Sequence, residues 1–171
     1  MEKIIKEINE GNVVSMPTDT VYGLFGLVNN ETKQKINILK QRDKNQPLQV
    51  MFPSIEQSLE SFIMNKEFEA EIVDQLKKGN SILVEANTEW KSKLGEENIL
   101  IRISTAPNEL IDILKQTGPL YATSANITNK DPLTSKEDIN SIFNISVAEG
   151  NIGSGNSSEI YSFINEQKKI R

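Results

Sequence analysis

Apolar positions recur at strand or helix spacing along the whole chain, and turn-forming residues separate the apolar segments. Short apolar runs that stop at proline or at polar residues are typical of buried strands. On this pattern we expect strands over residues 13–16, 25–28, 48–52, 81–86, 98–103, 120–123, 145–148 and 160–164.

Capping residues mark the starts of the helices between these strands. Ser54 with Gln57, and Thr134 with Glu137, have the spacing of a capping box, and Asn65 is suited to cap a third helix. The polar stretch 87–97 shows no clear period and is predicted to be a loop. Further helices are expected before Gly11, over residues 31–40 and over residues 107–115.

The alternation of helices and strands from end to end favours an α/β domain in which helices cover a sheet. A length of 171 residues is that of one domain, and the chain contains no linker or repeat, so we expect residues 1–171 to form a single domain.

The composition excludes several kinds of chemistry. The chain has no cysteine and no histidine, so disulfides, thiolate metal sites and imidazole bases are excluded. Its 24 acidic and 19 basic residues give a net charge of −5, which disfavours bulk attraction to nucleic acid or to anionic membranes. No apolar run approaches the roughly 18 residues of a membrane span, and the N-terminus lacks the apolar stretch of a signal peptide. We therefore expect a cytoplasmic protein with no membrane partner.

The first polar motif, PTDTVYGL, begins at residue 17, directly after a predicted strand. Strand ends are where α/β sheets present ligand-binding groups. Thr18 and Thr20 point to the same side if the backbone stays extended. The alternative is a turn whose hydroxyls hydrogen-bond to the local backbone.

Two basic features allow two interpretations each. Lys40, Arg42 and Lys44 follow a predicted helix, where they either complement the helix dipole or bind phosphate groups. Arg102 lies within an apolar strand, so it is either on a solvent-facing side of the strand or buried with a partner, because an unpaired buried charge is costly.

Two further motifs lie towards the C-terminus. ATSAN, residues 122–126, offers small side chains that let a ligand approach the backbone, or else forms a turn with asparagine in a left-handed conformation. GNIGSGNSS, residues 150–158, is either a nest of backbone N–H groups that binds an anion or a flexible turn, and it matches no phosphate-loop pattern.

The chain contains PTDTVYGL, the KxR pair, the arginine-bearing strand, TSAN and a late pair of hydroxyl residues. Taken together, these motifs resemble the YrdC/Sua5 family of L-threonylcarbamoyladenylate synthases. The order and spacing of these motifs match over nearly the whole chain. The resemblance implies a single YrdC-like domain with a twisted mixed sheet, flanking helices and a central cleft. It also implies that L-threonine, bicarbonate or CO2, and ATP react to give threonylcarbamoyl-AMP and pyrophosphate for the t6A modification of tRNA.

The resemblance also assigns roles to individual residues. Lys40 and Arg42 would be the catalytic phosphate ligands, and Mg²⁺ would accompany ATP without a cage of protein ligands. The pocket for L-threonine would be formed by Thr20, Arg102, Ala122, Thr123 and Ser158. The nucleotide would contact Arg42, Gln46, Ser124, Asn126 and Arg171.

The chain departs from the family pattern at several of these motifs. Asp43 follows Arg42, Gln46 precedes the Pro-Leu pair, Met51 stands where the family has histidine, and Ser158 stands where it has threonine. These departures motivate a second hypothesis, in which the domain binds nucleotide or double-stranded RNA without catalysis. The partners expected on either hypothesis include tRNA or tRNA-modification proteins.

Overall fold

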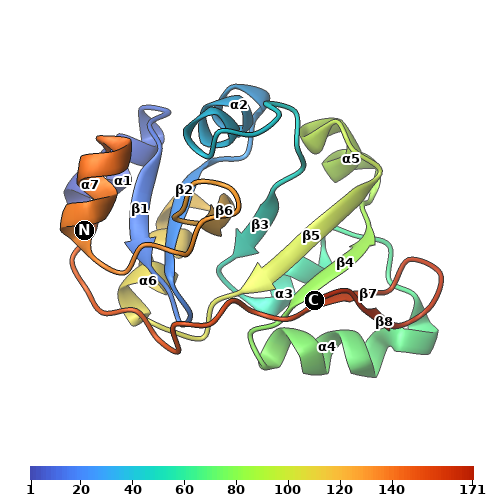
Figure 1. The fold of residues 1–171 in the computed structure, drawn as a ribbon. Coiled ribbons are helices and arrows are strands. Elements are labelled where there is room, and N and C mark those ends of the chain that lie inside the picture. Colours follow the sequence, from blue (N-terminus) through green and yellow to red (C-terminus); the bar gives the residue numbers. More distant parts are fainter.

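An eight-stranded mixed sheet runs through the computed structural model, which describes residues 1–171 (Figure 1). Its strands are β1 (Val14–Pro17), β2 (Tyr22–Leu27), β3 (Gln49–Phe52), β4 (Ser81–Glu85), β5 (Asn98–Ile103), β6 (Leu120–Ser124), β7 (Ile160–Ser162) and β8 (Lys168–Lys169). Their order across the sheet is β1-β2-β6-β3-β5-β4-β7-β8, and only the pairs β3–β5 and β4–β7 are parallel. The α/β class and the mixed sheet predicted for this chain are confirmed.

Helices pack on both faces of this sheet (Figure 1). They are α1 (Glu2–Asn9), α2 (Asn30–Leu39), α3 (Ile55–Leu59), the 3₁₀ helix η1 (Lys66–Phe68), α4 (Glu69–Lys77), α5 (Thr88–Leu94), α6 (Asn108–Thr117) and α7 (Lys136–Phe143). None of them combines the length and the apolar character that a membrane crossing requires.

The structure confirms two of the predicted helix caps and corrects the third. The Ser54 hydroxyl accepts a hydrogen bond from the Gln57 N–H, and Asn65 caps η1, which leads into α4. The capping box expected at Thr134 is wrong by one residue, because Ser135 accepts from the Asp138 N–H. Threonine and serine are adjacent there, and both are suitable caps by sequence.

The stretch 87–97, predicted to be a loop, contains α5. Asn87 caps it by accepting from the Trp90 N–H, and Gly95 ends it with a φ of +70°. Trp90 is buried and its ring lies 5.1 Å from that of Phe52. The helix has only seven residues, so its apolar side is too short to give a periodic signal.

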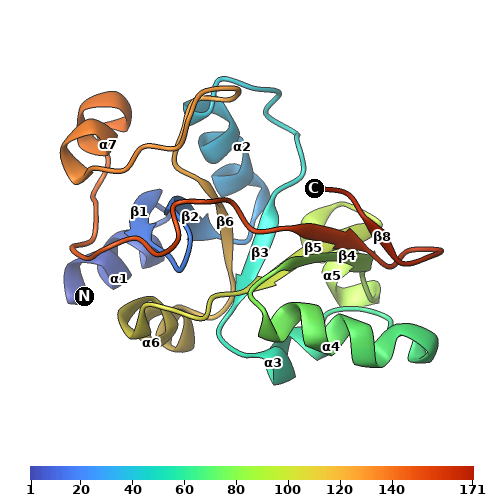
Figure 2. The ribbon, with the colours of Figure 1, turned by 60° about the horizontal axis from the view of Figure 1, so that its bottom comes forward.

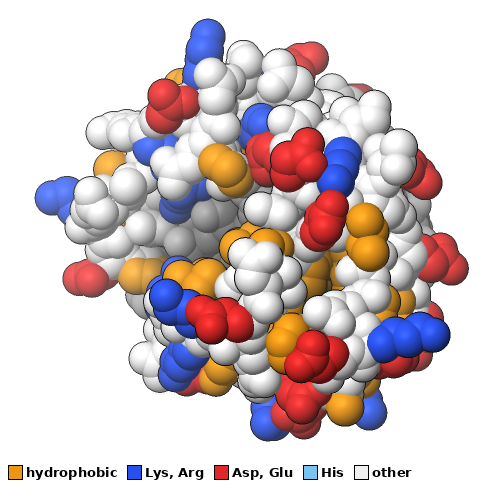
Figure 3. Space-filling view, turned by 90° about the vertical axis from the view of Figure 1, so that its right-hand side faces the viewer, with side chains coloured by type: hydrophobic (Ala, Val, Ile, Leu, Met, Phe, Trp, Pro, Cys, Tyr) orange, Lys and Arg blue, Asp and Glu red, His pale blue; other side chains and the backbone are white.

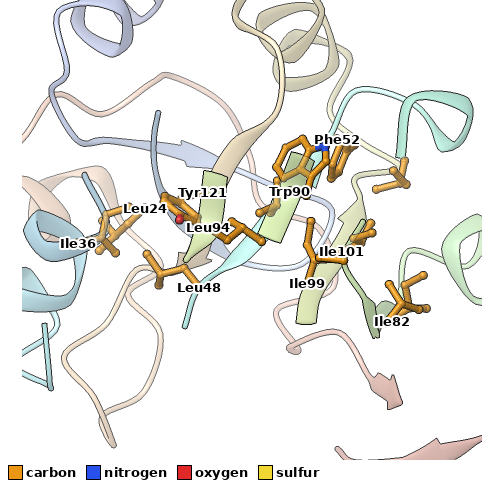
Figure 4. Close-up of a cluster of buried hydrophobic side chains, with 14 of the residues drawn as sticks. Leu24, Ile36, Leu48, Phe52, Ile82, Trp90, Leu94, Ile99, Ile101 and Tyr121 are labelled. Carbon is orange, nitrogen blue, oxygen red and sulfur yellow. The ribbon is translucent and has the colours of Figure 1, made fainter. Parts of the chain in front are cut away.

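Two apolar clusters hold the helices on the sheet. The larger one joins the sheet to α2, α4, α5 and α7, and Figure 4 shows Leu24, Tyr121 and Ile101 of the sheet within it, with Trp90 of α5 close by. The smaller one joins α1 and α6 to β1, β2, β3 and β6 through residues such as Phe25, Met51 and Ala122.

After α7 the chain crosses from one end of the sheet to the other before it forms β7 (Figure 2). The strand predicted over residues 145–148 is wrong, because this segment forms one isolated bridge, between Val147 and Ser15, and no continuous strand pairing. β8, a two-residue strand at the sheet edge, was not predicted. The crossing segment closes one side of the pocket described next.

Candidate functional site

A pocket of about 290 Å³ is lined by β2, β3, β5 and β6, by the turn after β1 and by the segment that leads into β7. Three arginines, Arg42, Arg102 and Arg171, contribute to its wall, and no aspartate or glutamate does. Figure 3 shows one face of the molecule hollowed, with Lys or Arg side chains inside the hollow and acidic side chains outside it. Six residues with hydroxyl groups and two glutamines complete the polar lining: Thr18, Thr20, Thr123, Ser124, Ser157, Ser158, Gln46 and Gln49.

The two threonines of the PTDT turn fit both interpretations of the motif: the Thr18 hydroxyl bonds to the local backbone, and both residues face the pocket. Thr18 Oγ1 donates to the Val21 carbonyl and accepts from the Thr20 N–H, so the local backbone is satisfied. Thr18 Oγ1 and Thr20 Oγ1 are also 2.9 Å apart, which confirms that both point to the same side. Both residues line the pocket, so this turn also presents hydroxyl groups to a ligand.

Arg102 is buried, with 4% of its surface exposed, and its partner is Asp19 of the PTDT turn. Its Nη2 lies 2.7 Å from Asp19 Oδ1, and its Nε donates to the Gly79 carbonyl at 2.9 Å. Thr105 Oγ1 also donates to the Asp19 carboxylate at 2.9 Å, and Ser104 Oγ lies 3.1 Å from it. Nη1 of Arg102 has no hydrogen-bond partner within the protein. Because every buried side-chain nitrogen has a partner, Nη1 is not buried, and it faces the pocket that Arg102 lines.

The glycine-rich segment packs its backbone against the PTDT turn. The N–H groups of Gly153, Ser154 and Gly155 donate to the carbonyls of residues 18, 19 and 20 in turn. The anion-binding nest that we considered for this segment is therefore absent at these amides, because the carbonyls already occupy them. This contact brings Ser157 and Ser158 to the pocket wall.

Arg42 and Gln46 come from the loop after α2. Arg42 Nε donates to the side-chain oxygen of Asn37, and the Asn37 amide donates to the carbonyls of Lys44 and Gln46. Asn37 is fully buried, so one side chain fixes the shape of the whole basic loop. Burial lowers the pKa of Arg42 from its usual value. Arg42 is nonetheless charged at neutral pH, because a guanidinium loses its proton only at very high pH.

Lys40 lies behind the pocket wall, where it holds the TSAN turn. Its Nζ donates to the Ser124 carbonyl at 2.7 Å, the Asn126 carbonyl at 3.0 Å and Asn126 Oδ1 at 2.9 Å. Ser124 Oγ also donates to Asn126 Oδ1. Since Nζ lies within hydrogen-bond distance of these three oxygens, the contact of Lys40 with the pocket is made through Ser124.

The environment of Lys40 predicts an unusual dependence of stability on pH. Burial, with repulsion from Arg42, lowers the pKa of Lys40 from 10.5 to about 7. Between these values the unfolded chain binds a proton that the folded chain lacks, so the free energy of unfolding should rise with pH. The expected slope between pH 7 and 9 approaches about 1.4 kcal/mol per pH unit.

Urea denaturation of the wild type and of Lys40→Met at several pH values measures this slope. The chain has no histidine or cysteine, so few other side chains titrate in this window. The Lys40→Met variant should be less stable overall and should lack the rise. Equal slopes in the two proteins would show that Lys40 keeps its proton up to pH 9.

The structure brings together most of the residues singled out from the sequence. Those that line the pocket are Thr20, Arg42, Gln46, Arg102, Ala122, Thr123, Ser124, Ser158 and Arg171. Lys40 and Asn126 lie behind the wall and contact it through the TSAN turn. Sequence reasoning missed Asp19, Gln49 and Ser81; Asp19 lies within the PTDT motif, whereas the other two have no local signal.

Residues 6–171 match the model of the Sua5, YciO and YrdC proteins, which is described as "Telomere recombination". The chain belongs to the Sua5/YciO/YrdC family. The resemblance inferred from the motifs is thus confirmed over nearly the whole chain.

Individual relatives of this family are distant in sequence. The threonylcarbamoyl-AMP synthase of Hydrogenovibrio crunogenus is 27% identical, over 97% of this chain and 94% of its own length. The threonylcarbamoyl-AMP synthase of Pasteurella multocida is 28% identical, over 84% of this chain and 81% of its own length. The crystal structure of P. abyssi Sua5 with L-threonine matches with a TM-score of 0.79 at 22% identity, over 94% of this chain. This chain spans about half of that Sua5 chain and 66% of a relative from Methanocaldococcus jannaschii.

Proposed function

We propose that this protein is an L-threonylcarbamoyladenylate synthase, which forms threonylcarbamoyl-AMP and pyrophosphate from L-threonine, bicarbonate or CO2, and ATP. The observation that carries the proposal is the charge of the pocket. Three arginines and no carboxylate line it, although the chain as a whole has a net charge of −5. Such a pocket is suited to a carboxylate and a polyphosphate bound side by side. The names of the two synthase relatives point to the same reaction.

The reaction needs positioning more than it needs a protein base. The amine of L-threonine adds to CO2 and releases a proton, which gives a carbamate. A carbamate oxygen then attacks the α-phosphorus of ATP, and the bond to the leaving pyrophosphate breaks. A pocket without histidine or a free carboxylate can promote these steps by alignment and by stabilising negative charge.

Each part of the pocket has a role in this proposal. The free Nη1 of Arg102 and the Thr20 hydroxyl bind the α-carboxylate and neighbouring atoms of L-threonine, beside Ala122 and Thr123. Arg42, Gln46 and Arg171 bind the nucleotide together with Ser124, which Lys40 and Asn126 hold in place.

Mg²⁺ enters the proposal with the nucleotide. No group of three or more Asp, Glu, His or Cys residues is placed to hold a metal ion, and Asp19 is already bound by Arg102. The pocket hydroxyls are compatible with a magnesium ion that keeps its waters and is held by the phosphates of ATP. There it would neutralise charge as pyrophosphate leaves.

Pyrophosphate release from ATP and Mg²⁺ in bicarbonate buffer, with and without L-threonine, tests the proposal. We expect release that depends on both L-threonine and bicarbonate. Release of pyrophosphate at the same rate with and without L-threonine would contradict the proposal.

A protein that binds double-stranded RNA, with an affinity that falls steeply with salt and without pyrophosphate release, would support the second hypothesis instead. If the synthase reaction is found, tRNA and proteins of the tRNA-modification machinery are the partners to test next, because they would use the product.

A further inference from the structure

A chain of three polar side chains crosses the floor of the pocket beside Arg102. Ser81 Oγ on β4 donates to Gln49 Oε1 on β3 at 2.6 Å, and it lies 3.1 Å from Ser158 Oγ, just before β7. Ser81 is fully buried, whereas Gln49 and Ser158 line the pocket. We call these three residues the Gln49–Ser81–Ser158 relay.

The relay has a defined direction, because a serine hydroxyl has only one proton. Ser81 gives its proton to Gln49, so Ser158 must be the donor in its contact with Ser81. Ser158 Oγ can then only accept a hydrogen bond from a ligand. The Gln49 Nε2 group has no partner in the protein and is not buried, so it can only donate to one. The pocket therefore offers a donor at one end of the relay and an acceptor at the other.

The position of the relay relates it to the atoms next to a bound carboxylate. β5 carries Arg102 and runs between β3 and β4, so Gln49 reaches Ser81 across the strand that holds the arginine. Neighbouring strands are about 4.8 Å apart. A carboxylate bound to Arg102 would therefore lie next to the two strands that carry Gln49 and Ser81.

We infer that Gln49 and Ser81 make this pocket specific for amino acids that carry a hydroxyl group on the β-carbon. This inference rests on the proposed function for the orientation of the substrate. A hydroxyl both donates and accepts, so it satisfies Ser158 and Gln49 together. Valine, which has the shape of threonine but a methyl group in place of the hydroxyl, leaves both ends unpaired. Sites built to hydrogen-bond a hydroxyl reject the analogue that lacks it.

The test compares binding of L-threonine with L-valine, and of L-serine with L-alanine, by calorimetry on the wild type and variants. Ser81→Ala removes the centre of the relay with little change in volume, and Gln49→Met removes the donor at similar length. We expect each variant to lower the threonine-to-valine affinity ratio by about tenfold. The serine-to-alanine ratio should fall in parallel.

Ser61→Ala is the matched control, since Ser61 is also a fully buried serine and donates only to the Ser58 carbonyl, outside the pocket. It should leave both ratios unchanged. Unchanged ratios in Ser81→Ala, or no binding of any amino acid by the wild type, would overturn the inference.

Pyrophosphate release is measured separately on the same proteins, which distinguishes the two proposals. Release that depends on threonine, with ratios insensitive to Ser81, would contradict the relay and leave the synthase function standing. Threonine binding that depends on Ser81, without any pyrophosphate release, would support the relay and contradict the synthase function.

Discussion

Replacing Arg102 by alanine is expected to abolish threonine-dependent pyrophosphate release, with a loss of at least about a thousandfold in kcat/KM. Arg102 supplies the cation with a free N–H group beside the relay, and Asp19 and the Gly79 carbonyl fix its orientation. Charged hydrogen bonds in a site sheltered from water are stronger than neutral ones, and positioning compounds their effect. Steady-state kinetics with varied L-threonine measures the loss.

The fold should survive this change at a cost in stability, because Asp19 loses its cation but keeps the hydrogen bond from Thr105. Circular dichroism and thermal denaturation check this point. Arg102→Lys is the companion variant, since it keeps the charge but loses the fork that binds Asp19 and a ligand together. It should raise KM for threonine more than it lowers kcat. Near-normal kcat/KM in Arg102→Ala would place the carboxylate site elsewhere.

Replacing Gly153 by alanine is expected to be the most disruptive small change in the chain. A Cβ atom at this position would lie 1.9 Å from the Asp19 carbonyl oxygen, which is backbone and cannot move aside alone. The segment must then lift, and the hydrogen bonds from residues 153–155 to the PTDT turn are lost. We expect the free energy of unfolding to fall by about 2–3 kcal/mol. Activity should fall by at least about a hundredfold, because Ser158 leaves the pocket.

Gly155→Ala is the control within the same segment. Gly155 has a φ of +78° but no atom within 4 Å of the added Cβ, so only the backbone strain is introduced. That strain costs about 1 kcal/mol. Urea denaturation and pyrophosphate release should therefore separate the two variants clearly. If Gly153→Ala behaves like Gly155→Ala, the segment does not pack on the PTDT turn as described.

Most secondary structure could be predicted from local patterns, and the failures have identifiable causes. β5 has the predicted bounds, because its apolar run is long and ends at polar residues on both sides. α5 was missed because seven residues give no period, although Asn87 and Gly95 are good local signals for its ends. Residues 145–148 are apolar enough for a strand, and they lie beside the edge strand β1. They pair with it at a single bridge, through the backbone hydrogen bonds of Ser146 and Ala148 with Ser15.

The site was predictable in composition and less so in contacts. PTDT and TSAN both contribute to the pocket, as their position after strands indicates. The partner of Arg102 lies 83 residues away in sequence, so no local pattern could identify Asp19. The anion nest was considered because the glycine-rich segment has the right composition. Backbone N–H groups bind whichever acceptor the fold brings to them, and here the acceptors are carbonyls of the PTDT turn.

The sequence by itself determined the α/β class, the absence of imidazole and thiol chemistry, and the motifs that identify the family. These depend on residue types and short-range spacing, which a chain carries before it folds. Only the tertiary structure decided that Lys40 faces the TSAN turn, that Gly153 must lack a side chain, and that Gln49, Ser81 and Ser158 form one relay. Each of these contacts joins residues separated by 30 or more positions in the sequence, and which of them meet is set by the strand order of the sheet.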